Sequence, residues 1–207
     1  TGKVVGAEAL VRWQKADGSM IYPDSFIPIF EKNGFITKVD FAILDQVLSY
    51  LGEAISAGEQ IVPVSVNFSR RHNETSDFVD QIFCKLQEKN IPAGYLEAEI
   101  TESVFMLDLS TLTDNLKKLK QNGIAISIDD FGSGYSSLNM LNQLSLDILK
   151  LDMQFIRSET TKPKSQGILR HIMQGFQGAG VCQVSHQNDE RIGIQGYRGR
   201  GRNQGAA

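Results

Sequence analysis

The chain has 207 residues, of which 41% are hydrophobic and 22% are charged, an ordinary mixture for a globular protein with a sizeable core. A net charge of −3 gives no general reason to expect nucleic-acid binding, and two cysteines without a CxxC pattern argue against a disulfide framework or a thiolate metal site. No apolar run approaches the roughly 18 residues that suggest a membrane span, and no signal peptide is visible.

Five apolar runs predict strands, and each carries polar residues toward its C-terminal end. Burying such side chains in a strand is costly unless a partner or a site requires them. The five runs, with their polar residues, are 3–13 with Glu8, 61–68 with Asn67, 96–103 with Glu99, 124–130 with Asp129 and Asp130, and 146–156 with Lys150.

Helical spacing of apolar residues separates these runs. It occurs after Pro23-Asp24-Ser25 and over 41–51, 78–86, 109–119, 138–144 and 168–172. Strand followed by helix, repeated five times, is typical of parallel βα units. In a (β/α)₈ barrel the carboxyl ends of all strands meet on one face, whereas a doubly wound sheet places its site in one crevice. The repeated polar strand ends therefore favour the barrel.

Asp129 and Asp130 end the fourth run, just before a loop that contains two glycines. Neighbouring residues of a regular strand point to opposite faces, so we expect the strand to end here if both carboxylates reach one site. No basic residue stands beside them, and a hard divalent ion such as Mg²⁺ would relieve their repulsion. The alternative interpretation of this segment is a capped turn.

The strand-end residues together suggest phosphoryl chemistry. Glu8, Asn67, Glu99 and Asp129 supply four oxygen ligands for one hard cation, and Asp130 can reach a second ion with Asp129 bridging. Two neighbouring ions form a clamp for in-line displacement at phosphorus, lower the pKa of bound water and neutralise the phosphate.

Three further side chains are candidates beside this cluster. Lys150 can orient the attacking water or stabilise developing charge, or else form a salt bridge to Asp152 or Asp147. Arg12 can make a bidentate phosphate contact, or it is a solvated arginine. Glu102 can hold the nearby glycine- and serine-containing loop in place, or it is a surface glutamate.

These residues lie in five ordered segments that together resemble the EAL domain, the cyclic-di-GMP-specific phosphodiesterase family of bacterial signalling. The resemblance covers roughly residues 1–175. The segments are Glu8-Ala9-Leu10-Val11-Arg12-Trp13, Val66-Asn67-Phe68-Ser69, Glu99-Ile100-Thr101-Glu102-Ser103, Asp129-Asp130-Phe131-Gly132-Ser133-Gly134-Tyr135-Ser136-Ser137-Leu138 and Leu149-Lys150-Leu151-Asp152.

The resemblance implies a TIM-like (β/α)₈ barrel that uses Mg²⁺ or Mn²⁺ to hydrolyse cyclic di-GMP to linear pGpG. It also implies a homodimer, an upstream sensory or GGDEF-type domain, and a cytoplasmic location, either alone or as part of a larger membrane-anchored protein. The implied roles are metal binding by Glu8, Asn67, Glu99, Asp129 and Asp130, water positioning by Lys150, loop anchoring by Glu102, and substrate binding by Arg12 and Asp152.

Both ends of the chain depart from this family pattern. The first strand, with its Gln-Pro motif, is expected before Thr1, and an EGVE motif that adds a ligand for the second metal is expected after residues 168–175. We therefore expect a piece of a longer protein with an incomplete barrel, lacking its first strand and with its last two strands missing or altered. Residues 1–175 would form the partial domain. The alternative function is a catalytically inactive, cyclic-di-GMP-binding sensor.

Residues 176–207 are expected to be an aberrant tail, frameshifted or disordered. With permitted codons, the bases encoding Gly196 to Ala206 can be read one base forward as VIAEGVETKEQ, which supplies the missing glutamate motif. Gln195-Gly196-Tyr197 resembles a late QGY motif of the family, and we interpret that match as coincidence. A Gly/Arg-rich tail could also be disordered or bind RNA, although three arginines and one aromatic residue are few for RNA binding.

Overall fold

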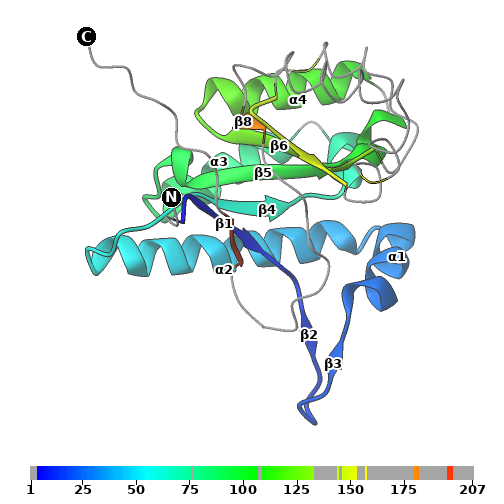
Figure 1. Cartoon of the computed structure of the whole chain (residues 1–207), viewed down its shortest axis with the longest axis horizontal. Coiled ribbons are helices and arrows are strands. Elements are labelled where there is room, and N and C mark those ends of the chain that lie inside the picture. The colour runs from blue at the N-terminus through cyan, green and yellow to red at the C-terminus, as the bar shows by residue number, and fades with distance from the viewer. Residues whose placement is uncertain are drawn as a thin grey trace.

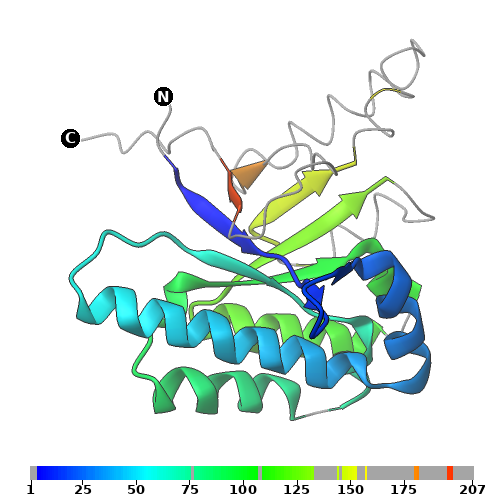
Figure 2. The same cartoon turned by 90° about the horizontal axis from the view of Figure 1, so that it is seen from below.

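The computed structural model shows a curled, largely parallel sheet with helices along its outer face (Figures 1 and 2). The strands run in the order β8-β7-β6-β5-β4-β1-β9. The residues that the structure describes are 4–75, 77–106, 109–132, 144, 146–152, 157, 180–181 and 195–197. The strands are β1 (Gly6–Ala9), β4 (Val64–Asn67), β5 (Leu96–Thr101), β6 (Ala125–Phe131), β7 (Ile148–Leu151), β8 (Gly180–Val181) and β9 (Gln195–Tyr197).

Each strand from β1 to β8 in this sheet is parallel to its neighbour, and β9 pairs antiparallel with β1. A small hairpin of β2 (Trp13–Gln14) and β3 (Met20–Ile21) extends away from the sheet beside the first helix (Figure 1). The helices are α1 (Pro23–Asn33), α2 (Ile36–Ser56), α3 (Phe78–Glu88) and α4 (Leu109–Gln121), with short 3₁₀ turns η1 (Arg70–Glu74), η2 (Ala93–Tyr95) and η3 (Glu102–Met106).

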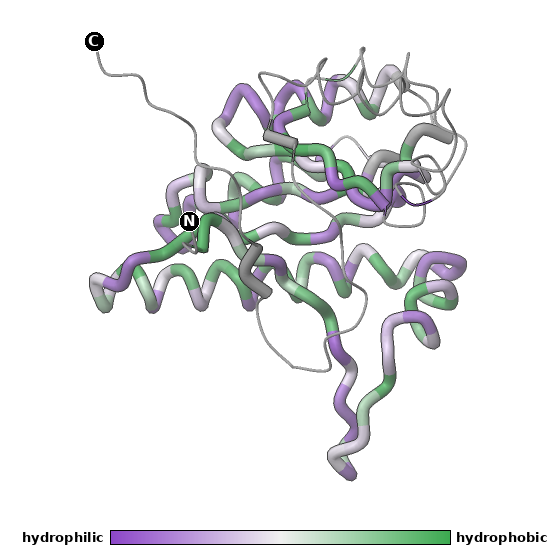
Figure 3. The backbone as a smooth tube through the Cα atoms, in the orientation of Figure 1, coloured by the Kyte–Doolittle hydropathy of each residue, from purple (hydrophilic) through white to green (hydrophobic). Residues whose placement is uncertain are grey.

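The hydrophobic core lies between the outer face of the sheet and helices α2, α3 and α4. Alternate strand residues supply it, because successive side chains of a strand point to opposite faces. Val64, Val66, Ile126 and Ile128 are all buried in this core, whereas the residues between them are polar. Figure 3 shows the corresponding alternation of hydrophobic and hydrophilic segments. The apolar positions of these strands therefore pack against the helices, and the alternate, polar positions face the inner side of the sheet.

The parallel βα order confirms the predicted fold class, a TIM-like (β/α)₈ barrel that is incomplete in this chain. Several strand bounds differ from the prediction. The run 3–13 contains β1 and the first residue of β2 rather than one strand, and the run 96–103 leaves the sheet at Thr101 because η3 begins at Glu102. The last run is described as strand only over Ile148–Leu151.

Other predictions fall on residues outside the described ranges. They include most of the helix predicted over 138–144, of which only Leu144 is described, the helix over 168–172, and the tail 176–207 apart from β8 and β9. The division of the chain near residue 175 stays a prediction. In the described part of the chain, no helix combines the length and apolar character that a membrane span requires.

Candidate active site

The polar residues predicted from the strand ends lie on neighbouring strands of the sheet. Asn67 of β4 is in register with Glu99 of β5, which is in register with Ser127 of β6. Lys150 lies on the next strand, β7. Since these positions alternate with the core residues, their side chains face away from the helices. The parallel sheet therefore places carboxylate, amide and ammonium groups on one inner face.

Glu99 and Lys150 form the buried centre of this face. The Glu99 side chain is fully buried, Lys150 is 6% exposed, and Lys150 Nζ lies 2.5 Å from Glu99 Oε1. Burial raises the pKa of the Glu99 carboxyl to about 8, although Lys150 opposes this shift. The alternative sequence interpretation paired Lys150 with Asp152 or Asp147, but the observed pairs are Lys150 with Glu99 and Asp147 with Lys120.

The charge of Lys150 is itself set by the surrounding carboxylates. Burial alone would lower the pKa of its ammonium group, yet Glu99, Glu8 and Asp129 outweigh burial and raise that pKa. The ammonium therefore stays protonated at neutral pH. A protonated amine at this point can donate hydrogen bonds to a phosphate oxygen or to a water molecule.

Glu99 Oε2 and Asp129 Oδ1 are carboxylate oxygens on this face that are buried without hydrogen bonds from the described part of the chain. Nearby, Asn67 Nδ2 donates a hydrogen bond to Glu8 Oε1 at 3.1 Å. The amide oxygen of Asn67 is then the atom that can coordinate a cation. Buried carboxylate oxygens are costly without a partner, so this face is suited to a cation or to hydrogen-bond donors.

The two aspartates are arranged differently from the sequence prediction. We expected the strand to end at Asp130, but β6 continues to Phe131. Its pairing with β7 is irregular between Ile128 and Phe131, and Asp130 adopts a left-handed conformation with φ of 54°. Such a β-bulge changes the direction in which successive side chains point. A bulge within the strand, rather than a strand end, thus breaks the alternation at the two aspartates.

Glu102 lies directly after β5, and its Oε2 accepts a hydrogen bond from the backbone N–H of Gly132 at 3.1 Å. This contact joins the end of β5 to the first residue after β6. The serine and second glycine of the predicted loop, from residue 133 on, lie outside the described ranges. The hydrogen bond gives Glu102 a structural link to the segment after Asp130.

The two predicted substrate-binding residues lie at different points of the fold. Arg12 is half-buried between β1 and β2, and its Nη1 donates to the carbonyl oxygen of Val11 at 2.8 Å. Asp152 comes directly after β7, and its backbone N–H donates to the carbonyl oxygen of Phe131. Neither contact tests a substrate-binding role, so both assignments stay predictions. Trp13, beside Arg12, is 44% exposed and packs against Phe26.

Comparison with known protein families identifies this arrangement. The family model described as EAL domain matches residues 1–184. The chain belongs to the EAL domain family. This finding confirms the predicted family and accounts for the shared inner face, because the five motif segments supply its polar residues.

Named relatives agree with the family. The signaling protein YkoW of Bacillus subtilis is 36% identical over 171 residues, which cover 83% of this chain and 21% of that protein. The cyclic di-GMP phosphodiesterase NbdA of Pseudomonas aeruginosa is 34% identical over 172 residues, which cover 83% of this chain and 22% of that protein. The chain spans less than a third of the curated relatives that it matches.

A solved structure supports the same assignment. The MucR phosphodiesterase in its c-di-GMP complex matches with a TM-score of 0.78 and 29% sequence identity. The match covers 91% of this chain and 77% of that chain.

The polar side chains on the inner face of this EAL domain are of the chemical types that bind a divalent ion. Mg²⁺ and Mn²⁺ prefer carboxylate and amide oxygens, and Glu99 Oε2 and Asp129 Oδ1 are two such atoms without hydrogen-bond partners in the described part of the chain. Within these described ranges, however, no three His, Cys, Asp or Glu side chains gather closely enough to hold an ion by themselves.

Sequence reasoning missed a second polar cluster in this EAL domain. Asp40 and His72 are buried, and they lie close to the end of β4 rather than on the inner face. A signal was available, because Asp40 falls between Ile36 and Leu44 at the spacing of the buried helix stripe. A carboxylate at such a position requires a partner.

Proposed function

We propose that this EAL domain is a metal-dependent phosphodiesterase that hydrolyses cyclic di-GMP to linear pGpG. The observation that carries the proposal is the pair of buried, unpartnered oxygens in the described part of the chain, Glu99 Oε2 and Asp129 Oδ1, beside the protonated Lys150. Family membership, the name of NbdA and the ligand of the MucR structure support cyclic di-GMP as the substrate.

Glu8, Asn67, Glu99 and Asp129 would hold the ion, and Asp130 would reach a second one. Bound Mg²⁺ or Mn²⁺ would acidify a coordinated water and neutralise charge on the phosphate. The bulge between Ile128 and Phe131 supports this role, because a break in the strand alternation is what two neighbouring carboxylates need in order to serve one site.

Lys150 would orient the attacking water and stabilise charge that develops on the phosphate oxygens. Its fixed position results from burial and from the short contact to Glu99. A preorganised charge of this kind acts strongly in a site that excludes water. Arg12 and Asp152 would contact the substrate, and Glu102 would hold the segment after β6 through Gly132.

The test is incubation of the whole chain with cyclic di-GMP and either MgCl₂ or MnCl₂, with chromatography of the nucleotides afterwards. We expect pGpG from the wild type and a loss of at least about 100-fold in Asp129→Asn, which removes one charged ligand but keeps the size of the side chain. Asp45→Asn is the matched control, because Asp45 is partly exposed and its carboxylate pairs with Lys85 on the outer surface.

Two results would overturn the proposal. Binding of cyclic di-GMP with no pGpG in either metal would identify the chain as a sensor. Equal product from the wild type and Asp129→Asn would place the chemistry elsewhere.

A further inference from the structure

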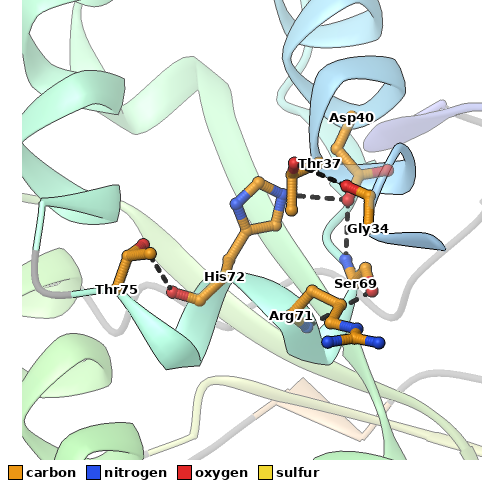
Figure 4. Close-up of polar contacts among 7 residues, drawn as sticks. All are labelled: Gly34, Thr37, Asp40, Ser69, Arg71, His72 and Thr75. Carbon is orange, nitrogen blue, oxygen red and sulfur yellow. Dashed lines mark hydrogen bonds and ion pairs between the residues drawn. The ribbon is translucent and has the colours of Figure 1, made fainter. Parts of the chain in front are cut away.

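The segment directly after β4 is held by one buried carboxylate on α2. Asp40 Oδ2 accepts a hydrogen bond from the backbone N–H of Ser69 at 2.8 Å and lies 2.9 Å from His72 Nε2 (Figure 4). Asp40 is 7% exposed and His72 is 3% exposed. A single oxygen atom thus fixes two positions of the chain just beyond Asn67.

The histidine ring is fixed by aromatic packing. It stacks on Phe78 with ring centroids 4.5 Å apart and an interplanar angle of 27°. Phe41 and Phe68 contact the ring edge-on, at 5.1 Å and 5.6 Å between centroids. Such an aromatic cage leaves the ring little rotational freedom. The cage therefore holds Nε2 toward Asp40, and this contact in turn orients the carboxylate toward Ser69.

Asn67 lies between the rest of strand β4, which precedes it, and a following segment that is held at several points. It is the last residue of β4, and the N–H of the next residue, Phe68, donates to the carbonyl oxygen of Glu99 at 2.8 Å. The residue after that, Ser69, is held by Asp40. Further along, Arg71 Nε donates to the carbonyl oxygen of Glu31 near the end of α1. The chain after Asn67 is therefore tied to both α1 and α2.

A buried polar side chain at Asp40 is not needed to fill space. Its neighbourhood is aromatic and aliphatic, and a desolvated carboxylate costs free energy that hydrogen bonds only partly recover. Polar groups in such places define one chain conformation where apolar packing would allow several. The conformation defined here is that of the segment carrying Asn67.

We propose that Asp40 and His72 are positioning residues, and that they hold Asn67 and the start of η1 in the geometry that binds the divalent ion. This inference rests on the proposed metal-dependent function. Neither residue touches the ion or the substrate. Outer hydrogen-bond partners of metal ligands usually contribute about 10- to 100-fold to metal affinity.

The first experiment measures Mn²⁺ affinity of the whole chain by titration with MnCl₂, detecting free Mn²⁺ by electron paramagnetic resonance. We expect Asp40→Asn to weaken binding by at least about tenfold, because the neutral amide is a poorer acceptor for Ser69 and His72. His72→Phe keeps a ring among the phenylalanines and removes Nε2, so it should weaken binding in the same direction.

Asp147→Asn is the matched control. Asp147 also pairs with a cation, Lys120, and accepts a backbone N–H, that of Ile126, but it does so near the opposite end of the sheet. Its substitution should change Mn²⁺ affinity by no more than about twofold. Unchanged affinity in both Asp40→Asn and His72→Phe, or an equal loss in Asp147→Asn, would overturn the proposal.

A second measurement separates this inference from the proposed function. Hydrogen exchange of the Phe68 amide in metal-free protein should be at least about tenfold faster in both Asp40→Asn and His72→Phe, and unchanged in Asp147→Asn. If the wild type binds no Mn²⁺, the proposed metal chemistry fails, and the Phe68 amide alone decides the positioning role. Equal exchange in the wild type and the two variants would then overturn it.

Discussion

The protonation of the buried Glu99 side chain is linked to the stability of the fold. In the folded chain burial raises its pKa to about 8, from an ordinary value of 4.5. The folded chain therefore binds this proton more tightly than the unfolded chain does. The stability linked to the proton is fully present below about pH 4.5 and is lost as the pH rises through about 8.

This linkage predicts a pH dependence of stability. In EDTA, the free energy of unfolding of the wild type should fall between pH 5 and pH 8 by about 1 kcal/mol or more, and Glu99→Gln should flatten that slope. Lys150 does not change the free energy of unfolding between pH 5 and pH 8, because its pKa is raised above 10.5. Its contribution to stability is lost only at higher pH. Urea unfolding at several pH values measures the slope. Parallel slopes for the two proteins would contradict the prediction.

Asp130 gives a second prediction at this scale, from its backbone rather than its charge. Its φ of 54° is a left-handed conformation that asparagine and glycine also adopt readily. Asp130→Ala should therefore cost about 1–2 kcal/mol of folding free energy, while Asp130→Gly and Asp130→Asn should cost less. Thermal or urea unfolding of the three variants makes the comparison. An alanine variant as stable as the glycine variant would show that the bulge relaxes.

Among the elements, α2 contributes most visibly to the core. Leu48 is fully buried beneath the sheet, whereas Tyr50 on the same helix is 47% exposed. Leu48→Ala should lower the free energy of unfolding by about 2–5 kcal/mol, and Tyr50→Ala should change it by only about 0.5 kcal/mol. Both variants place alanine in the same helix, so the difference between their urea midpoints reports how deeply the replaced side chains are buried. Similar midpoints would show that α2 is loosely packed.

At the scale of elements, the sequence predicts the features that periodicity determines and misses those that depend on a partner. Helical spacing located α2, α3 and α4, and the apolar runs located the strands that carry Glu8, Asn67 and Glu99. The bulge in β6 left no local signal, because bulges arise from pairing with a second strand. The partner of Lys150 was also beyond reach, since Glu99 is remote in sequence and adjacent only through the sheet.

For the whole molecule, the coding frame after about residue 175 decides what the C-terminal part of the chain is. The EAL family match ends at residue 184, and the sequence after it lacks an EGVE motif. If the frameshift hypothesis holds, sequencing of the coding DNA across codons 160–207 should show a single-base insertion or deletion near codon 175. The corrected frame should then spell EGVE. An intact frame would contradict the hypothesis and make the tail native.

The alternation along the strands has a consequence for how this domain can change. Outward-facing residues such as Val66 and Ile126 hold the helices, while inward-facing residues such as Asn67 and Ser127 face the site. Residues that pack the core and residues that line the candidate site therefore occupy interleaved positions along the same strands. A gene library varied only at the inward positions would leave the outward core residues unchanged while it samples new side chains at the site, and the same separation would let descendants of this domain change their inner face while keeping a recognisable shape.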